Sequence, residues 1–533
     1  MNATYLSIRK LVLISATLLL ASCGGSGDDF TDGNGLLNTV VPQSFDGVFL
    51  DAATFAQRCQ VPRTGTNPAT NQPYPDIQGA TLDENNFLRS YSKDTYLWYN
   101  EIIDRDPGLF SNPLTYFDLL KTTAITPTGQ NKDKFHFTYD SNDWFLLSQS
   151  GVSPGYGAQW VFLSTTPPRK VLVAYTEPGS AATVVGLSRG AEILEVDGVD
   201  IDGNTQADID TINGGLFPSG TGESHTFTVR DLGAAITRSI TMTSANITSA
   251  PVQNVQVLNT PTGSVGYMVF NDHIATAEEA LVDAVNQLNI APGIDDLVLD
   301  LRYNGGGFLA IASQLAYMIA GKVPTAGRNF ETMQFNDKHP ITNPVTGNPL
   351  SPTPFHDLTL GFGNLPQNQA LPTLNLSRVY VITGAGTCSA SEAIINGLLG
   401  VDVEVIQIGS TTCGKPYGFY PTDNCGTTYF TIQFRGVNQK GFGDYTDGFS
   451  PANQAGAGTL VQGCSIADDF TALLGDPAEG RLAATLVYRD TQTCPAATGF
   501  FQPGVSNRRT TLPVAEVIVP KSPWLTNRIM QQP

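Results

Sequence analysis

The stretch from Val379 to Gly400, VYVITGAGTCSASEAIINGLLG, constrains the fold more than any other part of the sequence. Its apolar beginning predicts a strand, its small residues a tight turn, and its apolar end a helix. The turn presents the hydroxyl groups of Thr387, Ser389 and Ser391 at the start of that helix. A serine in this place is commonly a helix cap, but a strand–turn–helix can also deliver a serine as a nucleophile.

A second turn follows one predicted strand later. The apolar segment Val401–Ile408 predicts the strand, and the sequence GSTTCGK then places Lys415 directly after a glycine. A lysine can accept the proton of a serine hydroxyl when burial lowers the pKa of its amine. A solvated surface charge is the alternative. Taken together, the two turns favour a nucleophile and base pair of Ser389 and Lys415.

Both segments resemble motifs of the C-terminal processing, or tail-specific, serine proteases of peptidase family S41. TCSASE (387–392) is similar to the family's S-A-S-A-S-E run, and GSTTCGK to its G-x-x-x-x-G-K turn. The resemblance implies Ser389 as nucleophile and Lys415 as general base. Many members add an acidic or amide residue, but here Asp402 is offset from that place and Phe419 replaces a glutamine. No third catalytic residue is therefore assigned.

A third segment, LVLDLRYNGGGFLAIA (297–312), resembles the family's D-L-R-x-N-x-G-G motif. In the family, one backbone N–H of this glycine turn and the N–H after the serine form the oxyanion hole. The resemblance implies Gly306, with Gly305 as the neighbouring candidate, and Ala390. Such donors stabilise the charge of a tetrahedral intermediate, and glycine lets the backbone approach the substrate closely.

The predicted fold class is α/β and multidomain. A chain of 533 residues is too long for one core, and the β-α-β-α alternation after residue 250 predicts a parallel layer. The resemblance implies a crotonase-like α/β catalytic domain, an inserted PDZ-like β domain and a small N-terminal helical subdomain. A helix is also expected over residues 468–489. The expected division is a signal peptide (1–22), a tether and N-terminal loop region (23–81), the helical subdomain (82–150), the PDZ-like domain (151–249), the catalytic domain (250–490) and a C-terminal tail (491–533).

The segment EPGSAATVVGLSRGAEILEVDGVDI (177–201) carries the resemblance to a PDZ module. Its Asp197-Gly198 pair, flanked by apolar residues, predicts a hairpin turn. A PDZ module binds an extended peptide C-terminus as an added strand. A regulatory lid without a ligand is the alternative. The loop that would bind the peptide carboxylate is expected at Gly155, Tyr156, Gly157 and Ala158.

The beginning of the sequence predicts export. Arg9 and Lys10 precede the apolar run LVLISATLLLAS, which is typical of a signal peptide. The run ends in Leu-Ala-Ser-Cys23, which resembles a bacterial lipobox and implies cleavage before Cys23 and lipidation of its thiol. An ordinary signal peptide is the alternative. Gly24 favours the outer membrane by resemblance to Gram-negative lipoproteins. The expected location is the bacterial cell envelope, anchored by lipid and facing the periplasm or the cell surface.

Cysteine usage agrees with an oxidising compartment. An even number of cysteines besides Cys23 predicts disulfides, although six cysteines allow fifteen pairings. Our first interpretation pairs Cys413 with Cys425 and Cys464 with Cys494, with Cys388–Cys413 as the alternative. The histidines and cysteines lack zinc-site spacing, so neither a metal nor another cofactor is expected. The cysteines concerned are Cys59, Cys388, Cys413, Cys425, Cys464 and Cys494.

Charge and motifs together define the expected function. The net charge of −19 argues against a nucleic-acid partner, which a basic surface would attract. We expect an exported serine endopeptidase that cleaves proteins or peptides near apolar C-termini through an acyl-enzyme, with PDZ-like recognition or gating. Its partners would be substrates with free C-termini and, through the lipid, the membrane; an adaptor or activator is not identified. The alternatives are a catalytically degenerate lipoprotein that binds peptides or hydrophobic ligands, and a serine esterase using the same nucleophile.

Overall fold

A computed structural model describes residues 47–126, 129–454, 458–495 and 528–529 of the chain. The predicted signal peptide and Cys23 lie outside these residues. All of the described residues belong to one structural unit, Phe45–Pro533. None of the helices in the described ranges combines the length and the hydropathy needed to cross a bilayer.

The region expected to be catalytic, residues 250–490 and called the catalytic region below, is built on a mixed sheet with the strand order β14-β15-β16-β20-β21-β28. The strands from β15 to β28 run parallel to their neighbours, and β14 pairs antiparallel with β15. This arrangement confirms the predicted α/β class. The strands are β14 (Val252–Thr260), β15 (Gly263–Phe270), β16 (Asp296–Asp300), β20 (Arg378–Thr383), β21 (Glu404–Gly409) and β28 (Gly463–Ser465).

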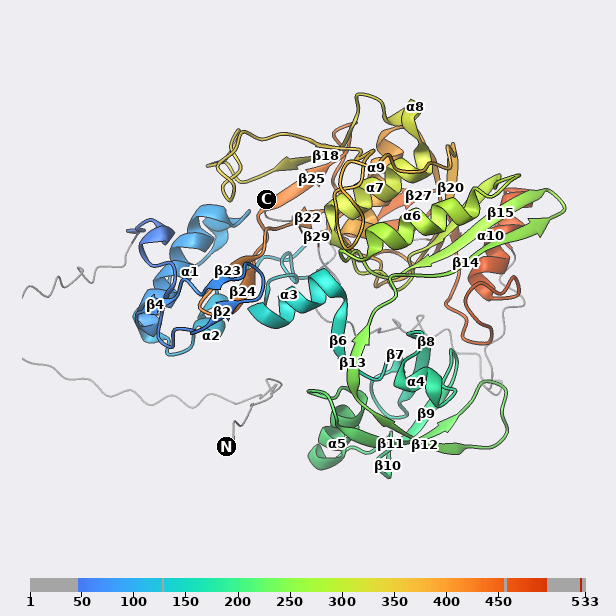
Figure 1. Ribbon diagram of the computed structural model, residues 1–533, viewed down its shortest axis with the longest axis horizontal. Helices are drawn as coiled ribbons and strands as arrows, with labels where there is room; N and C mark the ends of the chain where they lie inside the picture. The colour runs from blue at the N-terminus through green and yellow to red at the C-terminus, as the bar shows by residue number, and fades with distance from the viewer. Residues whose placement is uncertain (1–46, 127–128, 455–457, 496–527, 530–533) are drawn as a thin grey trace, which may run out of the picture. The chain divides into compact units, whose positions relative to one another are not determined.

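Alternate residues of the strands pack against helices on opposite faces of the sheet. Leu297 and Leu299 of β16 join the core formed with three helices, whereas Val298 packs in a second cluster with residues of a fourth helix. A parallel sheet covered on both faces requires such apolar residues on both sides. Figure 1 shows the first three helices side by side. They are α6 (Ala277–Leu288), α7 (Leu309–Ala320) and α9 (Ala390–Gly400); the fourth is α10 (Gly480–Thr491).

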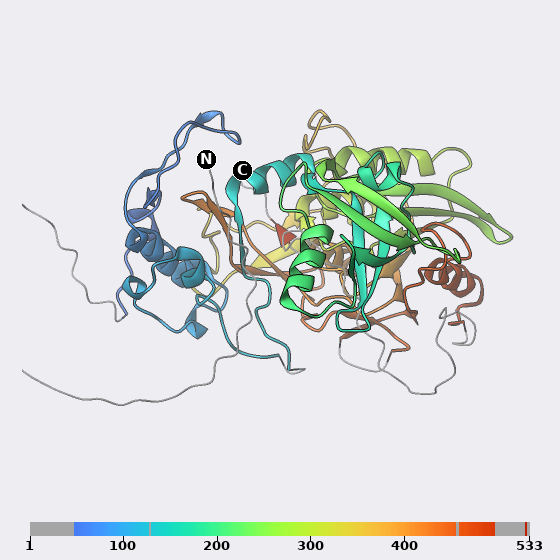
Figure 2. The same cartoon turned by 90° about the horizontal axis from the view of Figure 1, so that it is seen from below.

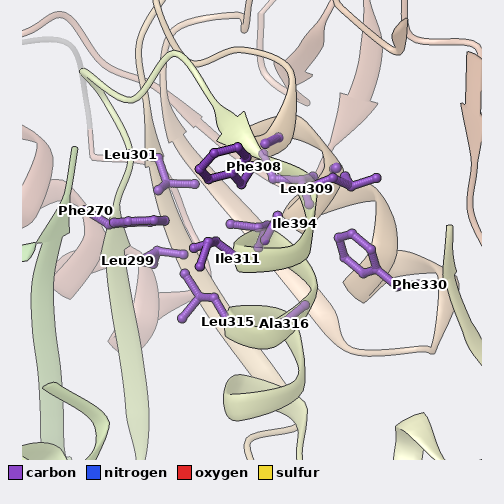
Figure 3. Packing of buried hydrophobic residues seen from close by; sticks show 14 of the residues in the cluster. Phe270, Leu299, Leu301, Phe308, Leu309, Ile311, Leu315, Ala316, Phe330 and Ile394 are labelled. Atoms are coloured by element: carbon purple, nitrogen blue, oxygen red, sulfur yellow. The ribbon is translucent and has the colours of Figure 1, made fainter. Parts of the chain in front are cut away.

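The main core fixes the helices that begin at the predicted catalytic turns. In Figure 3, Ile311 and Leu315 of α7 converge with Leu299 of β16 and Ile394 of α9, and all four side chains are fully buried. Helix α7 begins just after the glycine turn, and α9 begins just after Ser389. Close packing in protein interiors resists small displacements, so this core holds the two turns in a fixed relation.

Residues 151–249 form a β-rich lobe, called the β lobe below. Its sheet has the order β12-β11-β9-β8-β7, with β10 paired to β9, so that β7 is an edge strand among the described residues. A two-stranded ribbon of β6 and β13 leads into and out of the lobe. The elements are β6 (Val152–Gly155), β7 (Ala158–Ser164), β8 (Lys170–Thr176), α4 (Ala181–Val184), β9 (Glu192–Val196), β10 (Val199–Asp200), α5 (Gln206–Leu216), β11 (Ser224–Arg230), β12 (Arg238–Thr243) and β13 (Ala245–Thr248).

The N-terminal segment is attached to the catalytic region by a strand and by a disulfide. Strand β5 (Phe137–Asp140) pairs with β24 (Thr427–Phe430), which also pairs with β23 (Thr422–Asn424), and Cys59 is bonded to Cys425. Figures 1 and 2 show an orange-brown segment from the later part of the chain beside the blue N-terminal segment. Its other elements are η1 (Ala52–Thr54), β1 (Arg58–Cys59), β2 (Thr66–Asn67), β3 (Gln72–Pro73), β4 (Ile77–Gln78), α1 (Thr81–Thr95), η2 (Tyr99–Glu101), η3 (Pro107–Leu109), α2 (Pro113–Phe117) and α3 (Ser141–Ser150).

The remaining elements lie in the connections of the catalytic region. A smaller sheet has the order β19-β18-β25-β22, and two further parallel pairs are β26 with β27 and β17 with β29. Their bounds are β17 (Gly307–Phe308), α8 (Lys322–Thr325), β18 (Asn329–Gln334), β19 (Thr353–Pro354), β22 (Tyr417–Gly418), β25 (Phe434–Val437), β26 (Phe449–Pro451), β27 (Thr459–Val461) and β29 (Arg528–Ile529).

The helix predicted over residues 468–489 is wrong in its first half. Helix α10 begins only at Gly480. Gly475 adopts a φ of +87°, outside the helical region, and Pro477 follows it. The segment before the helix serves instead to place Asp468 between arginine side chains, which is described below.

Candidate active site

Ser389 lies at a strained turn between β20 and α9. It precedes the first residue of the helix, and its φ of 60° and ψ of −110° are unusual for a residue with a side chain. Such strain costs about 1–3 kcal/mol and persists only where the surroundings enforce it. The side chain is fully buried. The strand–turn–helix expected from the sequence is therefore present, with Ser389 at its sharpest point.

The carboxylate of Glu392 connects this turn to the turn that carries Lys415. Its Oε2 accepts the backbone N–H groups of Ser389 (2.9 Å) and Lys415 (2.8 Å). Its Oε1 accepts the N–H of Gly414 (2.9 Å) and the hydroxyl of Thr412. Complete burial raises the pKa of this carboxyl group, while these four hydrogen bonds oppose the rise. Ser389 and Lys415 therefore share one buried anchor.

A disulfide joins the same two turns covalently. Cys388 is bonded to Cys413, and the N–H of Cys413 also donates to the carbonyl of Thr387 at 3.0 Å. The preferred pairing of Cys413 with Cys425 is thus wrong, and the alternative is confirmed. Cys425 bonds instead to Cys59, which sequence spacing could not suggest because 366 residues separate them. The pairing of Cys464 with Cys494 is confirmed.

Lys415 is fully buried beside aromatic rings. Its Nζ lies 4.6 Å from the ring centroid of Phe135 and 4.7 Å from that of Phe419. Phe419 lies four residues after the lysine in the sequence. Phe135 comes from the N-terminal segment and had no sequence signal. The possible third catalytic residue, Asp402, is exposed and binds Lys440 and Arg328, so it does not reach this site.

The two residues expected to form the oxyanion hole lie on turns that contact each other. Ala390 is the first residue of α9, and Gly306 precedes β17. The carbonyl of Asn304 accepts the N–H of Cys388 (3.2 Å) and the hydroxyl of Ser391 (3.1 Å), so the glycine turn is bound to the serine turn. The N–H of Gly306 itself donates to Oδ1 of Asn304 at 2.9 Å. To stabilise an oxyanion, the N–H of Gly306 would have to leave Oδ1 of Asn304 and donate to the substrate oxygen instead.

His273 supports the glycine turn from the neighbouring strand. Its Nδ1 lies 3.0 Å from Oδ1 of Asn304 and 3.2 Å from the carbonyl oxygen of Gly306. The ring is buried. His273 belongs to no triad motif in the sequence. It contacts the turn of the expected oxyanion hole, and its role in the structure is to position Asn304 and Gly306.

A pocket of about 270 Å³ lies at the base of the β lobe. Its walls include the link between β6 and β7, the end of α5 and the edge strand β7. The acidic residues Glu177 and Asp272 also line it. Glu177 accepts the N–H of Ala250 at 2.8 Å, and Asp272 accepts the hydroxyl of Ser249 at 3.0 Å. The four residues expected to form a carboxylate loop, Gly155, Tyr156, Gly157 and Ala158, all line this pocket.

A buried ionic network connects the β lobe to the strand that leads into the glycine turn. Arg189 of the lobe donates to Asp468 (2.9 Å) and to the hydroxyl of Tyr303 (2.6 Å). Asp468 also accepts from Arg302 at 2.8 Å, and Arg302 contacts Glu479. Burial alone would raise the pKa of Asp468, but the charges of the surrounding arginines lower it well below its ordinary value. Tyr303 is the residue directly before Asn304.

One group of residues at this site has the spacing of metal ligands. Among the described residues, the one group of potential ligand atoms close enough to hold an ion comprises Cys388, Glu392 and Cys413. Both cysteines are in the disulfide, and the Glu392 oxygens accept hydrogen bonds. A cysteine binds a metal as its thiolate, and neither cysteine is a thiolate while the disulfide is intact, so this group does not fit a metal.

Replacement of Glu392 by glutamine should destabilise the protein. The amide NH₂ would face backbone N–H groups that the carboxylate now accepts, leaving a buried donor without its acceptor. We expect the free energy of unfolding to fall by about 2–4 kcal/mol, measured by urea denaturation. The control is Glu404→Gln at the exposed first position of β21, which should change it by about 0.5 kcal/mol or less. Equal effects of the two substitutions would contradict the anchoring role.

Comparison with known proteins relates part of the chain to one family. Residues 264–419 match the family model of peptidase family S41. The carboxyl-terminal-processing protease of Picosynechococcus sp. is 28% identical over 277 residues, covering 50% of this chain and 56% of the relative. The chloroplastic carboxyl-terminal-processing peptidase 1 of Arabidopsis thaliana is 29% identical over 177 residues, covering 31% and 35%. The matches thus span about a third to a little over half of these relatives.

A solved structure shows the same fold. A Bacteroides fragilis protein assigned to the S41 proteases superposes with a TM-score of 0.57 at 22% identity, covering 79% of this chain and 98% of that one. The matched family region contains the turns of Gly306, Ser389 and Lys415, which the structure brings together. Residues 264–419 of the chain therefore resemble the peptidases of family S41, and the fold extends that likeness beyond the matched region.

Proposed function

We propose that the protein is a serine endopeptidase that cleaves protein substrates near their C-termini through a covalent acyl-enzyme. The observation that carries this proposal is the shared anchor of the two turns, in which one oxygen of Glu392 accepts the N–H of both Ser389 and Lys415. The family model matched by residues 264–419 and the names of the relatives favour the same reaction class.

The proposed reaction is an acyl transfer. Lys415 in its neutral form accepts the proton of Ser389, whose Oγ attacks the scissile carbonyl. The backbone N–H groups of Ala390 and Gly306 stabilise the oxyanion, after Gly306 releases Asn304. The protonated lysine then donates its proton to the leaving amine. Water then attacks the acyl-enzyme while Lys415 accepts a proton from it. Ser389 is released as its hydroxyl when the lysine returns that proton. Burial disfavours a charged amine, and the burial of Lys415 supports its use as the base.

Substitution of the pair tests the proposed reaction. Ser389→Ala and Lys415→Met should each lower the cleavage of an unfolded protein with an apolar C-terminus by roughly 10⁴-fold, since each removes an essential group. The control Lys440→Met alters an exposed lysine and should retain activity. Cleavage by all variants would reject the assignment.

The same experiment separates the alternatives. A serine esterase would hydrolyse a small acyl ester in a Ser389-dependent manner and leave every protein substrate intact. A degenerate binding protein would hydrolyse neither the ester nor the protein, yet would bind peptides equally well with and without Ser389. We favour the peptidase because both turns retain the required side chains in one buried site.

The β lobe is proposed to be a PDZ-like module that recognises the C-terminus of the substrate. Edge strand β7 leaves room for an added peptide strand, and the pocket at its start provides a place for the terminal residue. The backbone N–H groups of the Gly155–Ala158 loop are the donors expected to bind the terminal carboxylate, whereas Glu177 and Asp272 already accept hydrogen bonds from Ala250 and Ser249. We infer that occupation of the lobe gates the active site through Arg189, whose hydrogen bonds to Asp468 and Tyr303 lead to the glycine turn.

Removal of the Arg189 guanidinium should weaken this gating. Arg189→Met is expected to reduce the kcat for a protein substrate by about 5–150-fold, the range of typical coupling free energies, with a smaller effect on an ester that does not use the lobe. The matched control is Arg238→Met, because Arg238 bonds only within the lobe, to Asp231, Val185 and Gly186. Equal loss on both kinds of substrate would indicate a structural role instead.

The enzyme is further proposed to be exported and anchored by a lipid on Cys23 in the bacterial envelope, with the outer membrane favoured. Three disulfides among the described residues support an oxidising compartment. Cells expressing the protein should incorporate a clickable palmitate analogue into it, and Cys23→Ala should abolish the label. Labelling that survives this substitution would exclude Cys23 as the anchor.

A further inference from the structure

A short strand near the end of the sequence pairs with the backbone that follows the glycine turn. Strand β29 runs parallel to β17, with Arg528 opposite Gly307 and Ile529 opposite Phe308. Strand β17 begins directly after Gly306. The main chain of residues 528–529 therefore lies alongside the expected oxyanion hole, where Figure 1 shows β29 next to β22.

The same strand also lies next to the turn of the catalytic lysine. Cα atoms of β29 lie within 8 Å of those of β22, and β22 begins at Tyr417, two residues after Lys415. Residues 528–529 are thus flanked by the glycine turn on one side and the lysine turn on the other. An acyl-transfer substrate must place its scissile carbonyl between the same two turns.

Gly307 is shaped to lie between two extended segments. One side of its backbone forms a parallel bridge with His273, and the other pairs with Arg528. Its φ is +132°, and a Cβ at this position would lie 2.4 Å from the carbonyl oxygen of His273. Only glycine fits there, so Gly307 lets β17 approach His273 closely on one edge while its other edge pairs with the main chain of β29.

We propose that the edge of β17 binds the extended main chain of the substrate, and that residues 528–529 occupy it as an internal competitor. This inference rests on the proposed function.

Charge supports the proposal: residues 496–533 contain four basic side chains and one acidic, in a chain of net charge −19. Reach supports it too. Cys494 is fixed by its disulfide, and an extended segment from there to Arg528 could span roughly 100 Å at about 3.3 Å a residue.

Proline substitution in the full-length mature chain tests the proposal. Proline lacks the N–H needed for strand pairing, so the double variant Arg528→Pro/Ile529→Pro should vacate the edge of β17. The matched control is Thr510→Pro/Thr511→Pro, outside the paired residues. All variants are made in the Ser389→Ala background, so that binding is measured without cleavage. The probe is a fluorescent peptide of residues 521–533, followed by anisotropy.

The peptide should bind the vacated variant at least about tenfold more tightly than it binds the parent and the control, because a competitor that occupies a site about nine-tenths of the time lowers apparent affinity by that factor. A probe peptide with prolines at the positions of Arg528 and Ile529 should lose this gain, which excludes binding of its C-terminus to the β lobe. Equal affinity of all three proteins would overturn the proposal.

Activity provides a second readout with Ser389 present. Vacating the edge should lower KM for a protein substrate by about tenfold and leave kcat nearly unchanged, as expected when only a competitor is removed. A lower kcat with the same KM would contradict the proposal. If no variant cleaves any substrate, the proposed peptidase function fails, whereas the binding measurement still decides whether residues 528–529 occupy the edge of β17.

Discussion

The buried carboxylate of Glu392 is the interaction on which the site depends. Two turns that are 26 residues apart at Ser389 and Lys415 meet on one oxygen of this side chain. A buried carboxylate is costly unless its hydrogen bonds are satisfied, and here backbone donors from both turns satisfy it. The strained φ of Ser389 is tolerated because three contacts fix the same turn. These are the hydrogen bond from its N–H to Glu392, the Cys388–Cys413 disulfide and the packing of helix α9.

Much of this arrangement could be predicted from sequence, because the residues that carry it are local. The strand–turn–helix at Ser389 and the alternating parallel layer follow from apolar patterns and small residues in single stretches. The Ser389-x-x-Glu392 spacing is also that of a capping box, in which serine and glutamate bond each other's backbone. That pattern could have identified Glu392 as a structural residue, but it could not show that Glu392 also binds the turn of Lys415.

The remaining features arise from contacts between distant segments, which leave no periodic signal. Phe135 reaches Lys415 from the N-terminal segment, and Asp468 meets Arg189 across the boundary of the β lobe. The helix predicted to begin at Asp468 was wrong in its first half. The positive φ of Gly475 interrupts a helix there, and Asp468 instead forms ion pairs with buried arginines. The pairing of Cys59 with Cys425 likewise depends on the tertiary fold, because the two cysteines are far apart in the sequence.

The disulfide pattern has a consequence for the order in which the protein matures. A chain that is oxidised from its N-terminus onward would meet Cys388 first as a partner for Cys59, yet the structure bonds Cys59 to Cys425 and Cys388 to Cys413. Sequential oxidation would therefore first join Cys59 to Cys388 and leave Cys413, on the turn of Lys415, without the partner it has in the structure. Exchange between thiols and disulfides, which proceeds over seconds to hours, then becomes part of assembling the active site.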